Sequence, residues 1–183
     1  MLANARELRI DFAGVADAVV SHNHGDHTGG LLGLRESARG RDTAALGRVH
    51  VAPGIFWPRP SPAGVSNGLL RVKEEYERSG GTFVEHAGAA MIAPGVWVTG
   101  PVPRVHPERN FPGGGRVQAP DGVREDTVPE DMSLVFDTPS GLVVLSGCGH
   151  AGLINTLDHA RKAVRAAPIH AAVGARRDVV SDR

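Results

Sequence analysis

The sequence predicts a single α/β domain, and three properties of the chain support this. Its 183 residues are enough for one domain with a real core but too few for two of ordinary size. Glycine and proline are frequent, with 24 and 13 residues, which indicates many turns between short elements. Aromatic residues make up only 4%, so the core must be built mainly from Val, Leu, Ala and Ile. Numerous connections and an aliphatic core together favour an α/β chain.

Charge and cysteine content narrow the classes of partner and compartment. The chain has 20 Lys and Arg residues and 20 Asp and Glu residues, so its net charge is zero. It therefore lacks the excess of positive charge that is typical of proteins that bind nucleic acid or an anionic membrane. No window reads as a signal peptide or a membrane span. The single cysteine, Cys148, excludes an intramolecular disulfide and favours a reducing compartment. We therefore expect a cytoplasmic protein, and homo-oligomers remain compatible with the sequence.

The first third of the chain predicts two helices and a strand. Residues 2–9 form a short amphipathic helix, and an apolar run predicts a buried strand over 17–21. A second helix begins at Thr28 and continues to about residue 38. The predicted buried face of that helix is Leu31, Leu34 and Ala38.

The middle of the chain alternates strands with one helix. Strands are predicted over 48–52, 82–86 and 95–99, and the Pro/Gly-rich stretch 53–68 is expected to be loop. Residues 69–79 have helical spacing of apolar side chains and end at a pair of glycines.

The segment 100–131 is long and rich in proline, glycine and charge. A structureless run of this length inside a compact domain indicates either a functional lid or disorder. We interpret it as a lid over the candidate site described below. His86, Arg104 and His106 near this lid could meet an anionic substrate, and the alternative for each is an ordinary surface residue.

The last third has the most regular pattern. Residues 133–138 and 141–146 predict a β-hairpin, 151–166 a helix and 168–174 a closing strand. The tail at 175–183 is polar and expected to be irregular, so the predicted domain spans 1–174. The side chains expected to point inward from the helix are Leu153, Ile154, Leu157, Ala160 and Val164.

The stretch 21–30 carries the clearest chemical signal, with three imidazoles and one carboxylate within six residues after an apolar strand. Alternate residues of an extended backbone point to one side, so His22 and His24 face one cavity, and a turn at Gly25 brings the next two ligands round to it. Zinc, manganese and iron accept imidazole and carboxylate. The alternative is a polar loop that merely caps a helix. The candidate ligands here are His22, His24, Asp26 and His27.

A second group of candidate residues follows the strand at 141–146. His150 stands between a predicted strand and a predicted helix, which repeats the setting of the first motif, so we interpret it as a metal ligand. Gly147 and Gly149 indicate a backbone packed tightly against another segment. The alternative for His150 is a polar residue at the helix N-terminus. Cys148 is a metal ligand, a neighbour of the ligands, or a small core residue.

The pattern His-x-His-x-Asp-His before Thr-Gly-Gly-Leu resembles the metallo-β-lactamase superfamily. Residues 142–157 are similar to the 7,8-dihydropterin-6-methyl-4-(β-D-ribofuranosyl)-aminobenzene-5'-phosphate synthase branch, as are 96–104 and 130–134. The resemblance implies a metallo-β-lactamase-like αββα sandwich with one or two divalent metal ions at the sheet edge. It also implies a metal-dependent hydrolase or transferase acting on a phosphate or pyrophosphate group of a small anionic, pterin-related molecule.

Carried onto this sequence, the resemblance assigns His22, His24 and His150 to one metal ion, and Asp26 and His27 to a second. Asp26 is also the expected catalytic residue, because it would orient the water that attacks the substrate. Zinc is the expected ion, with manganese, iron and magnesium as alternatives.

Two departures from the family pattern give an alternative function. The family has earlier strands, so the sandwich is expected to be incomplete at its N-terminus. It also has a histidine after the last strand, where this chain has the altered tail 175–183. The second metal site would then be incomplete, or would be completed by His50, His170 or a partner chain. The alternative is therefore a catalytically impaired metal-binding fragment that acts as a binding or structural domain. A nuclease is disfavoured by the neutral charge.

Overall fold

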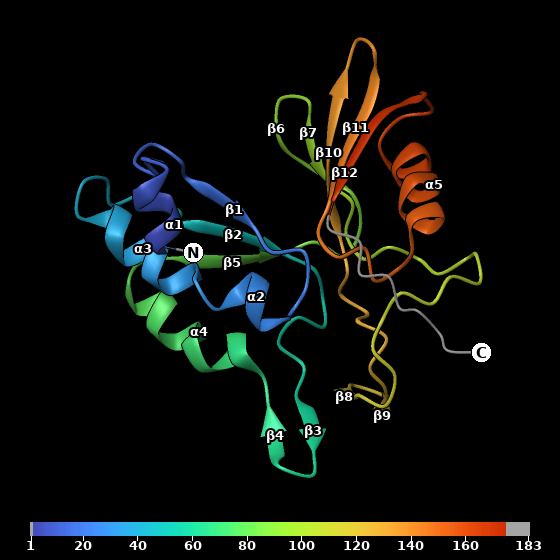
Figure 1. Ribbon diagram of the computed structural model, residues 1–183, viewed down its shortest axis with the longest axis horizontal. Helices are drawn as coiled ribbons and strands as arrows, with labels where there is room; N and C mark the ends of the chain where they lie inside the picture. Colours follow the sequence, from blue (N-terminus) through green and yellow to red (C-terminus); the bar gives the residue numbers. More distant parts are fainter. Residues whose placement is uncertain (1, 175–183) are drawn as a thin grey trace.

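Two β-sheets packed face to face, with helices on both outer sides, form the centre of the structure (Figure 1). This computed structural model describes residues 2–174, and the expected irregular tail at 175–183 lies outside the described residues. Ala52, Val98 and Met132 are buried where the two sheets meet. The layer order is helix, sheet, sheet, helix, which confirms the predicted αββα sandwich.

The N-terminal half builds a parallel sheet of three strands in the order β1-β2-β5. Val49 and Val51 are fully buried beneath two helices, together with Leu69 and Tyr76. The elements of this half are α1 (Leu2–Glu7), β1 (Asp17–Val19), α2 (Gly25–Thr28), α3 (Leu31–Arg39), β2 (Arg48–Val51), α4 (Gly68–Arg78) and β5 (Thr82–Glu85). The predicted buried face of α3, formed by Leu31, Leu34 and Ala38, is confirmed.

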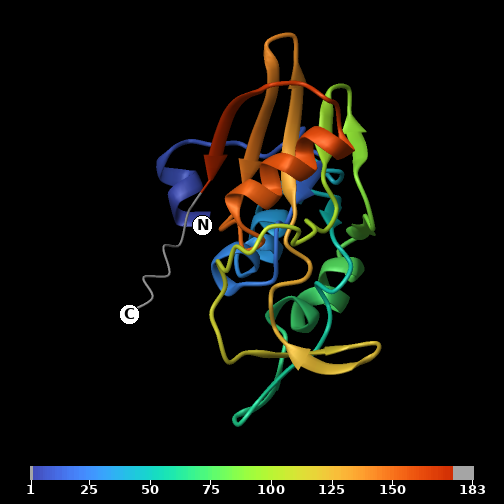
Figure 2. The ribbon, with the colours of Figure 1, turned by 90° about the vertical axis from the view of Figure 1, so that its right-hand side faces the viewer.

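The C-terminal half builds a mixed sheet in the order β12-β11-β10-β7-β6. A single helix, α5, lies across its outer face (Figure 2). Val135, Leu142, Val144 and Ala160 form the core between this helix and the sheet. The elements are β6 (Ala90–Ala93), β7 (Val96–Val98), β10 (Ser133–Thr138), β11 (Gly141–Ser146), α5 (Leu153–Ala163) and β12 (Ile169–Gly174).

The first turn of α5 departs from the sequence prediction. Leu153 and Ile154 were expected to point inward but are 50% and 56% exposed. The helix begins only at Leu153, so these two side chains extend beyond the strands that it covers and border a cavity of about 620 Å³. Leu157 and Val164 pack on the sheet as predicted.

Three segments contain strands that the sequence pattern did not indicate. The expected loop 53–68 contains the hairpin β3 (Arg59–Ser61) and β4 (Gly64–Ser66). The expected lid 100–131 is not structureless, because it contains the hairpin β8 (Arg116–Ala119) and β9 (Gly122–Glu125). β6 was also missed. Both hairpins turn through two residues that include a proline, and proline and glycine were interpreted only as loop formers.

None of the helices within residues 2–174 has the length and apolar character needed to cross a membrane.

Candidate metal centre

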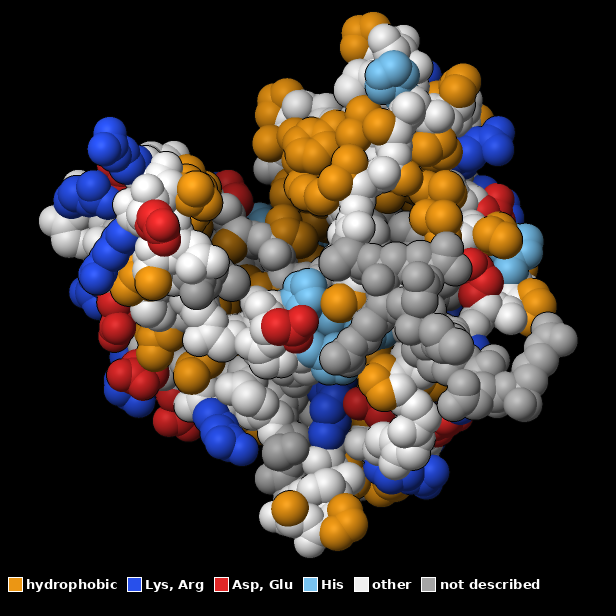
Figure 3. Space-filling view, in the orientation of Figure 1, with side chains coloured by type: hydrophobic (Ala, Val, Ile, Leu, Met, Phe, Trp, Pro, Cys, Tyr) orange, Lys and Arg blue, Asp and Glu red, His pale blue; other side chains and the backbone are white. Residues whose placement is uncertain are grey.

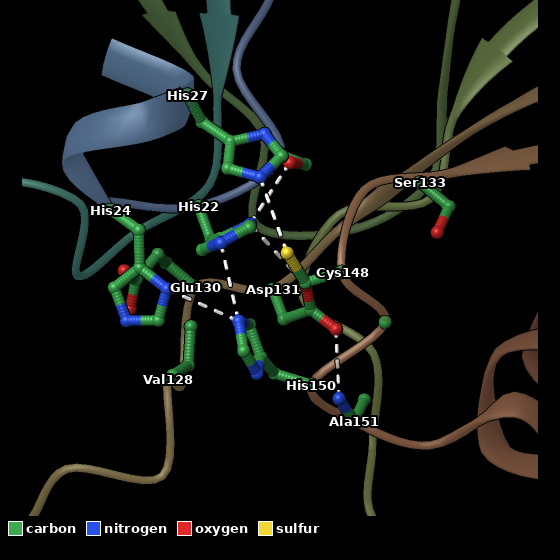
Figure 4. A network of polar contacts seen from close by, with 12 residues as sticks. His22, His24, His27, Val128, Glu130, Asp131, Ser133, Cys148, His150 and Ala151 are labelled. Atoms are coloured by element: carbon green, nitrogen blue, oxygen red, sulfur yellow. Dashed lines mark hydrogen bonds and ion pairs between the residues drawn. The ribbon is translucent and has the colours of Figure 1, made fainter. Parts of the chain in front are cut away.

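Three histidines from both halves of the molecule converge at one end of the sheets (Figure 4). Nε2 of His150 lies 3.2 Å from Nε2 of His22 and 3.2 Å from Nδ1 of His24. The ring planes of His22 and His24 each stand close to perpendicular to that of His150, at 82° and 83°. Three ring nitrogens that meet in this way match the donor set of a zinc-type site. Figure 3 shows imidazoles in the hollow between the two halves.

The protonation of His150 is set by a contact on the far side of its ring. Nδ1 lies 2.6 Å from the carbonyl oxygen of Asn110, which can only accept a hydrogen bond, so Nδ1 must donate the proton. Nε2 then keeps its lone pair and faces the other two histidines. Such an outer hydrogen bond is typical of histidines that bind metal. Asn110, which the sequence did not single out, therefore supports a ligand role for His150.

The loop that carries His150 approaches the first motif very closely. A Cβ atom at Gly147 would collide with the side chain of Ser21 and lie 3.5 Å from Nδ1 of His22. Asn110 Nδ2 donates hydrogen bonds to the carbonyls of Cys148 and Gly149, at 3.0 and 2.8 Å. The tight packing that the glycines predicted is thus confirmed.

His27 and Cys148 form a second close contact beside the three histidines (Figure 4). Nε2 of His27 lies 3.2 Å from Sγ of Cys148 and 3.6 Å from Oδ2 of Asp26. The Asp26 side chain is 74% exposed. Gly25 does not form the separate turn that the sequence predicts. It begins α2 instead, and this one helical turn, preceded by the extended residue His24, brings His27 back toward His22.

Burial keeps the three converging imidazoles neutral. Loss of water contact, with a smaller effect of the neighbouring imidazoles, lowers the pKa of His22 to about 2. Burial also lowers the pKa values of His24 and His150. Neutral imidazoles offer free lone pairs, so the donor set suits a divalent cation at neutral pH.

Two buried carboxylates, Glu130 and Asp131, lie behind the histidines. Oε1 of Glu130 accepts hydrogen bonds from the backbone N–H of Asn23 and from Arg59, at 3.0 and 2.6 Å. Oδ2 of Asp131 accepts the backbone N–H of Ala151 at 2.8 Å. Burial raises the pKa of both carboxyls, that of Asp131 to about 7.

These contacts connect the segment before β10 to the two segments that carry the converging histidines. Oδ1 of Asp131 also lies 3.9 Å from Nδ1 of His22. Glu130 and Asp131 are not among the site residues that the sequence predicts. The signal that could have found them is a pair of acidic residues placed directly before a buried strand, where charge is costly.

Other predicted contributors lie outside this cluster. His50 contacts Asp17 at 3.0 Å and His86 at 2.9 Å, so its ring nitrogens are already engaged. His170 lies exposed on β12. Within residues 2–174, neither histidine belongs to a metal-type group, so neither completes the second site. Arg104 donates hydrogen bonds to the carbonyls of Val128 and His150, both at 3.3 Å, and therefore supports the loops.

Comparison with known proteins confirms the resemblance and the fold. No protein-family model matches the chain. The 7,8-dihydropterin-6-methyl-4-(β-D-ribofuranosyl)-aminobenzene-5'-phosphate synthase of Methanocaldococcus jannaschii is 27% identical over 180 residues, which cover 95% of this chain and 60% of that protein. A crystal structure of a metal-dependent hydrolase of the β-lactamase superfamily aligns with a TM-score of 0.74 and 27% identity, over 99% of this chain and 64% of that one. The chain has the fold of this superfamily and spans less than two thirds of each relative.

Proposed function

We propose that this protein is a metal-dependent hydrolase or transferase that acts on a phosphate or pyrophosphate group of a small, pterin-related anion. The observation that carries the proposal is the convergence of three neutral ring nitrogens, two of them 3.2 Å from Nε2 of His150. Two similar proteins support it, because one is named as a metal-dependent hydrolase and the other as a dihydropterin-related synthase. A cytoplasmic location is part of the proposal and is supported by the single cysteine.

Different residues of the candidate metal centre would bind metal, orient water and support the ligands. His22, His24 and His150 would hold one divalent ion, zinc by its preference for imidazole, and His27 and Asp26 would contribute to a second. A bound ion of this kind lowers the pKa of water and neutralises charge on phosphate oxygens. Asp26 is exposed beside His27, so its carboxylate can accept a hydrogen bond from water and orient it toward a substrate in the hollow. Asn110 and Asp131 hold the segment of His150 in place.

The first experiment measures metal content and turnover together. Purified protein reconstituted with zinc is expected to retain one to two ions per chain by elemental analysis. It is also expected to hydrolyse a generic phosphodiester or inorganic pyrophosphate. Replacing His22 and His24 together with Ala should abolish turnover and the retention of the ion that the three histidines hold, because two of the three converging nitrogens are lost.

The matched control is His170→Ala, which removes an exposed histidine outside the cluster and should leave metal content unchanged. Protein that retains no metal after reconstitution would overturn the proposal. Metal binding without any turnover would favour the second candidate, a catalytically impaired metal-binding domain.

A further inference from the structure

We infer that the cavity beside the first turn of α5 binds the aromatic ring of the substrate, and that Arg109 in its lining binds an anionic group attached to that ring. This inference rests on the proposed function, because it assigns a binding place to the part of the same substrate that is not phosphate. The ligand class is a flat ring system that contains nitrogen or oxygen and carries one negatively charged substituent. The cavity has a volume of about 620 Å³. Sites for small molecules typically measure about 300–1,000 Å³, so a ring of this kind fits.

Apolar side chains from the C-terminal sheet and from α5 surround most of this cavity. Val144 of β11 and Ala172 of β12 are partners in the strand register, and both line the cavity together with Leu157 of α5. The exposed side chains of Leu153 and Ile154 border the same space. Side chains of this kind offer little to a strongly hydrated group, but they can bury the faces of a flat ring.

Ser146, at the end of β11, adds a hydroxyl group to the lining. Its Oγ is buried and forms no hydrogen bond within the described residues 2–174. Burial of a hydroxyl group without a hydrogen bond is unfavourable, so a ligand atom that pairs with it would gain affinity. A ring that contains nitrogen or carries oxygen provides such an atom, whereas a hydrocarbon ring does not.

Among the described residues that line the cavity, Arg109 is the only one with a positive charge. Its guanidinium lies 4.9 Å from the ring centroid of Phe111, and its Nη2 lies 2.7 Å from Oε1 of Glu125. Both side chains of this ion pair are exposed to water, and such pairs are weak, so an anionic group of a ligand can take the place of Glu125. Glu108, which also lines the cavity, already accepts two backbone N–H groups in the first turn of α5.

The cavity adjoins the candidate metal centre. Cys148 lines it and also contacts His27, with Sγ 3.2 Å from Nε2 (Figure 4). Asn110 lines it as well, and the carbonyl oxygen of Asn110 lies 2.6 Å from Nδ1 of His150. A ring in the cavity therefore lies against the residues that contact His27 and His150, and a phosphate joined to the ring by a short linker can reach the three histidines.

Fluorescence anisotropy of 6-carboxypterin tests the inference, because this fluorescent ring carries a carboxylate as its anionic group. Zinc-reconstituted wild-type protein should bind it. Ala172→Phe should weaken binding by about tenfold or more, because the added phenyl ring occupies the cavity and removes most of the buried contact. Ala171→Phe is the matched control, since it adds the same side chain on the opposite face of β12, outside the lining, and should keep the affinity. Hydrolysis of inorganic pyrophosphate, which has no ring, should be unchanged in both variants.

Two further variants separate the charge from the ring. Arg109→Gln should weaken the binding of 6-carboxypterin about fivefold, as loss of an exposed ion pair does, and should not change the binding of pterin, which lacks the carboxylate. Leu153→Asp places a negative charge on an exposed side chain at the border of the cavity and should also weaken the binding of 6-carboxypterin. Because Leu153 is exposed, this variant tests the cavity even if Ala172→Phe fails to fold.

The variant in which Ala replaces both His22 and His24 separates this inference from the proposed function. It should bind 6-carboxypterin as wild-type protein does, because neither histidine lines the cavity. Loss of binding in this variant would overturn the inference, since the probe would then be held at the metal. Wild-type protein that binds neither ring, or equal affinities in wild-type protein, Ala172→Phe and Leu153→Asp, would overturn it as well, while metal content and pyrophosphate hydrolysis would still support the proposed function. Protein that binds the ring but retains no metal would overturn the proposed function alone.

Discussion

Gly147 determines how closely the segment of His150 can approach the segment of His22. The space that a Cβ would need is already taken by Ser21, whose carbonyl also accepts the backbone N–H of Met132 at 3.0 Å. Ser21 therefore cannot move away without disturbing β10. The contact is between a backbone and a short, fixed side chain, so it has little capacity to relax.

At this position we expect Gly147→Ala to lower the free energy of unfolding by about 1–3 kcal/mol, as overpacked substitutions do. Zinc affinity should fall as well, because the ring nitrogens of His22 and His150 would be pushed apart. Guanidinium unfolding of the metal-free protein and a zinc competition titration measure the two effects. Unchanged values of both would mean that the loop shifts without cost.

Among the elements, α3 combines a well-defined buried face with one unfavourable helix residue. Arg35 is buried at 2% exposure, and its guanidinium donates hydrogen bonds to the carbonyls of Thr43 and Ser79. These bonds attach the helix to the loop before β2 and to the end of α4. Gly33, the third residue of the same helix, makes no such contribution, and a Cβ added there would meet nothing within 4 Å.

Gly33→Ala should therefore stabilise the protein by about 0.5–1 kcal/mol, because alanine loses less backbone freedom than glycine in a helix. The increase should appear in chemical unfolding with no change in metal content. This variant is also the control for Gly147→Ala, since both add a single methyl group. Destabilisation by Gly33→Ala would show that the surface of α3 is covered.

Across the whole molecule, buried ionisable groups from both halves meet at the candidate metal centre. The pKa of His22 is lowered to about 2, and those of His24 and His150 are also lowered. Below about pH 6.5 the unfolded chain therefore binds protons at these histidines that the native protein does not bind. These histidines therefore make the metal-free protein less stable as the pH falls.

Two carboxyl groups change the stability of the protein with pH in the opposite direction. The pKa of Asp131 is raised to about 7 and that of Glu130 is raised as well. Above about pH 4 the unfolded chain has released these protons while the native protein still holds them, so stability decreases at these groups as the pH rises toward 7. We expect the effect of the three histidines on stability to outweigh that of the two carboxyl groups below pH 6.5.

We expect metal-free protein to unfold at a lower guanidinium concentration at pH 5 than at pH 6.5. Circular dichroism at both pH values would measure the two midpoints. His24→Gln should reduce the difference, because one shifted histidine is removed. An equal or higher midpoint at pH 5 would contradict the assignment of neutral, buried histidines.

The sequence alone determined the elements with strong local patterns and the identity of the first metal motif. The hairpin of β10 and β11, the helix α4 and the buried face of α3 all follow from periodicity, which depends on neighbours two to four residues away. The spacing of His22 and His24 also places both rings toward one cavity. These properties are local, so the chain encodes them before it folds.

Only the tertiary structure decided what completes and supports the site. His22 and His150 are separated by 128 residues, and their contact depends on how the two sheets pack. The same packing brings Asn110 and Asp131 behind His150 and places Cys148 against His27. It also leaves Leu153 and Ile154 exposed although their spacing is apolar and helical. Residues far apart in the sequence carry no local signal of one another, because close contact between them arises only when the core excludes water and fixes both sheets.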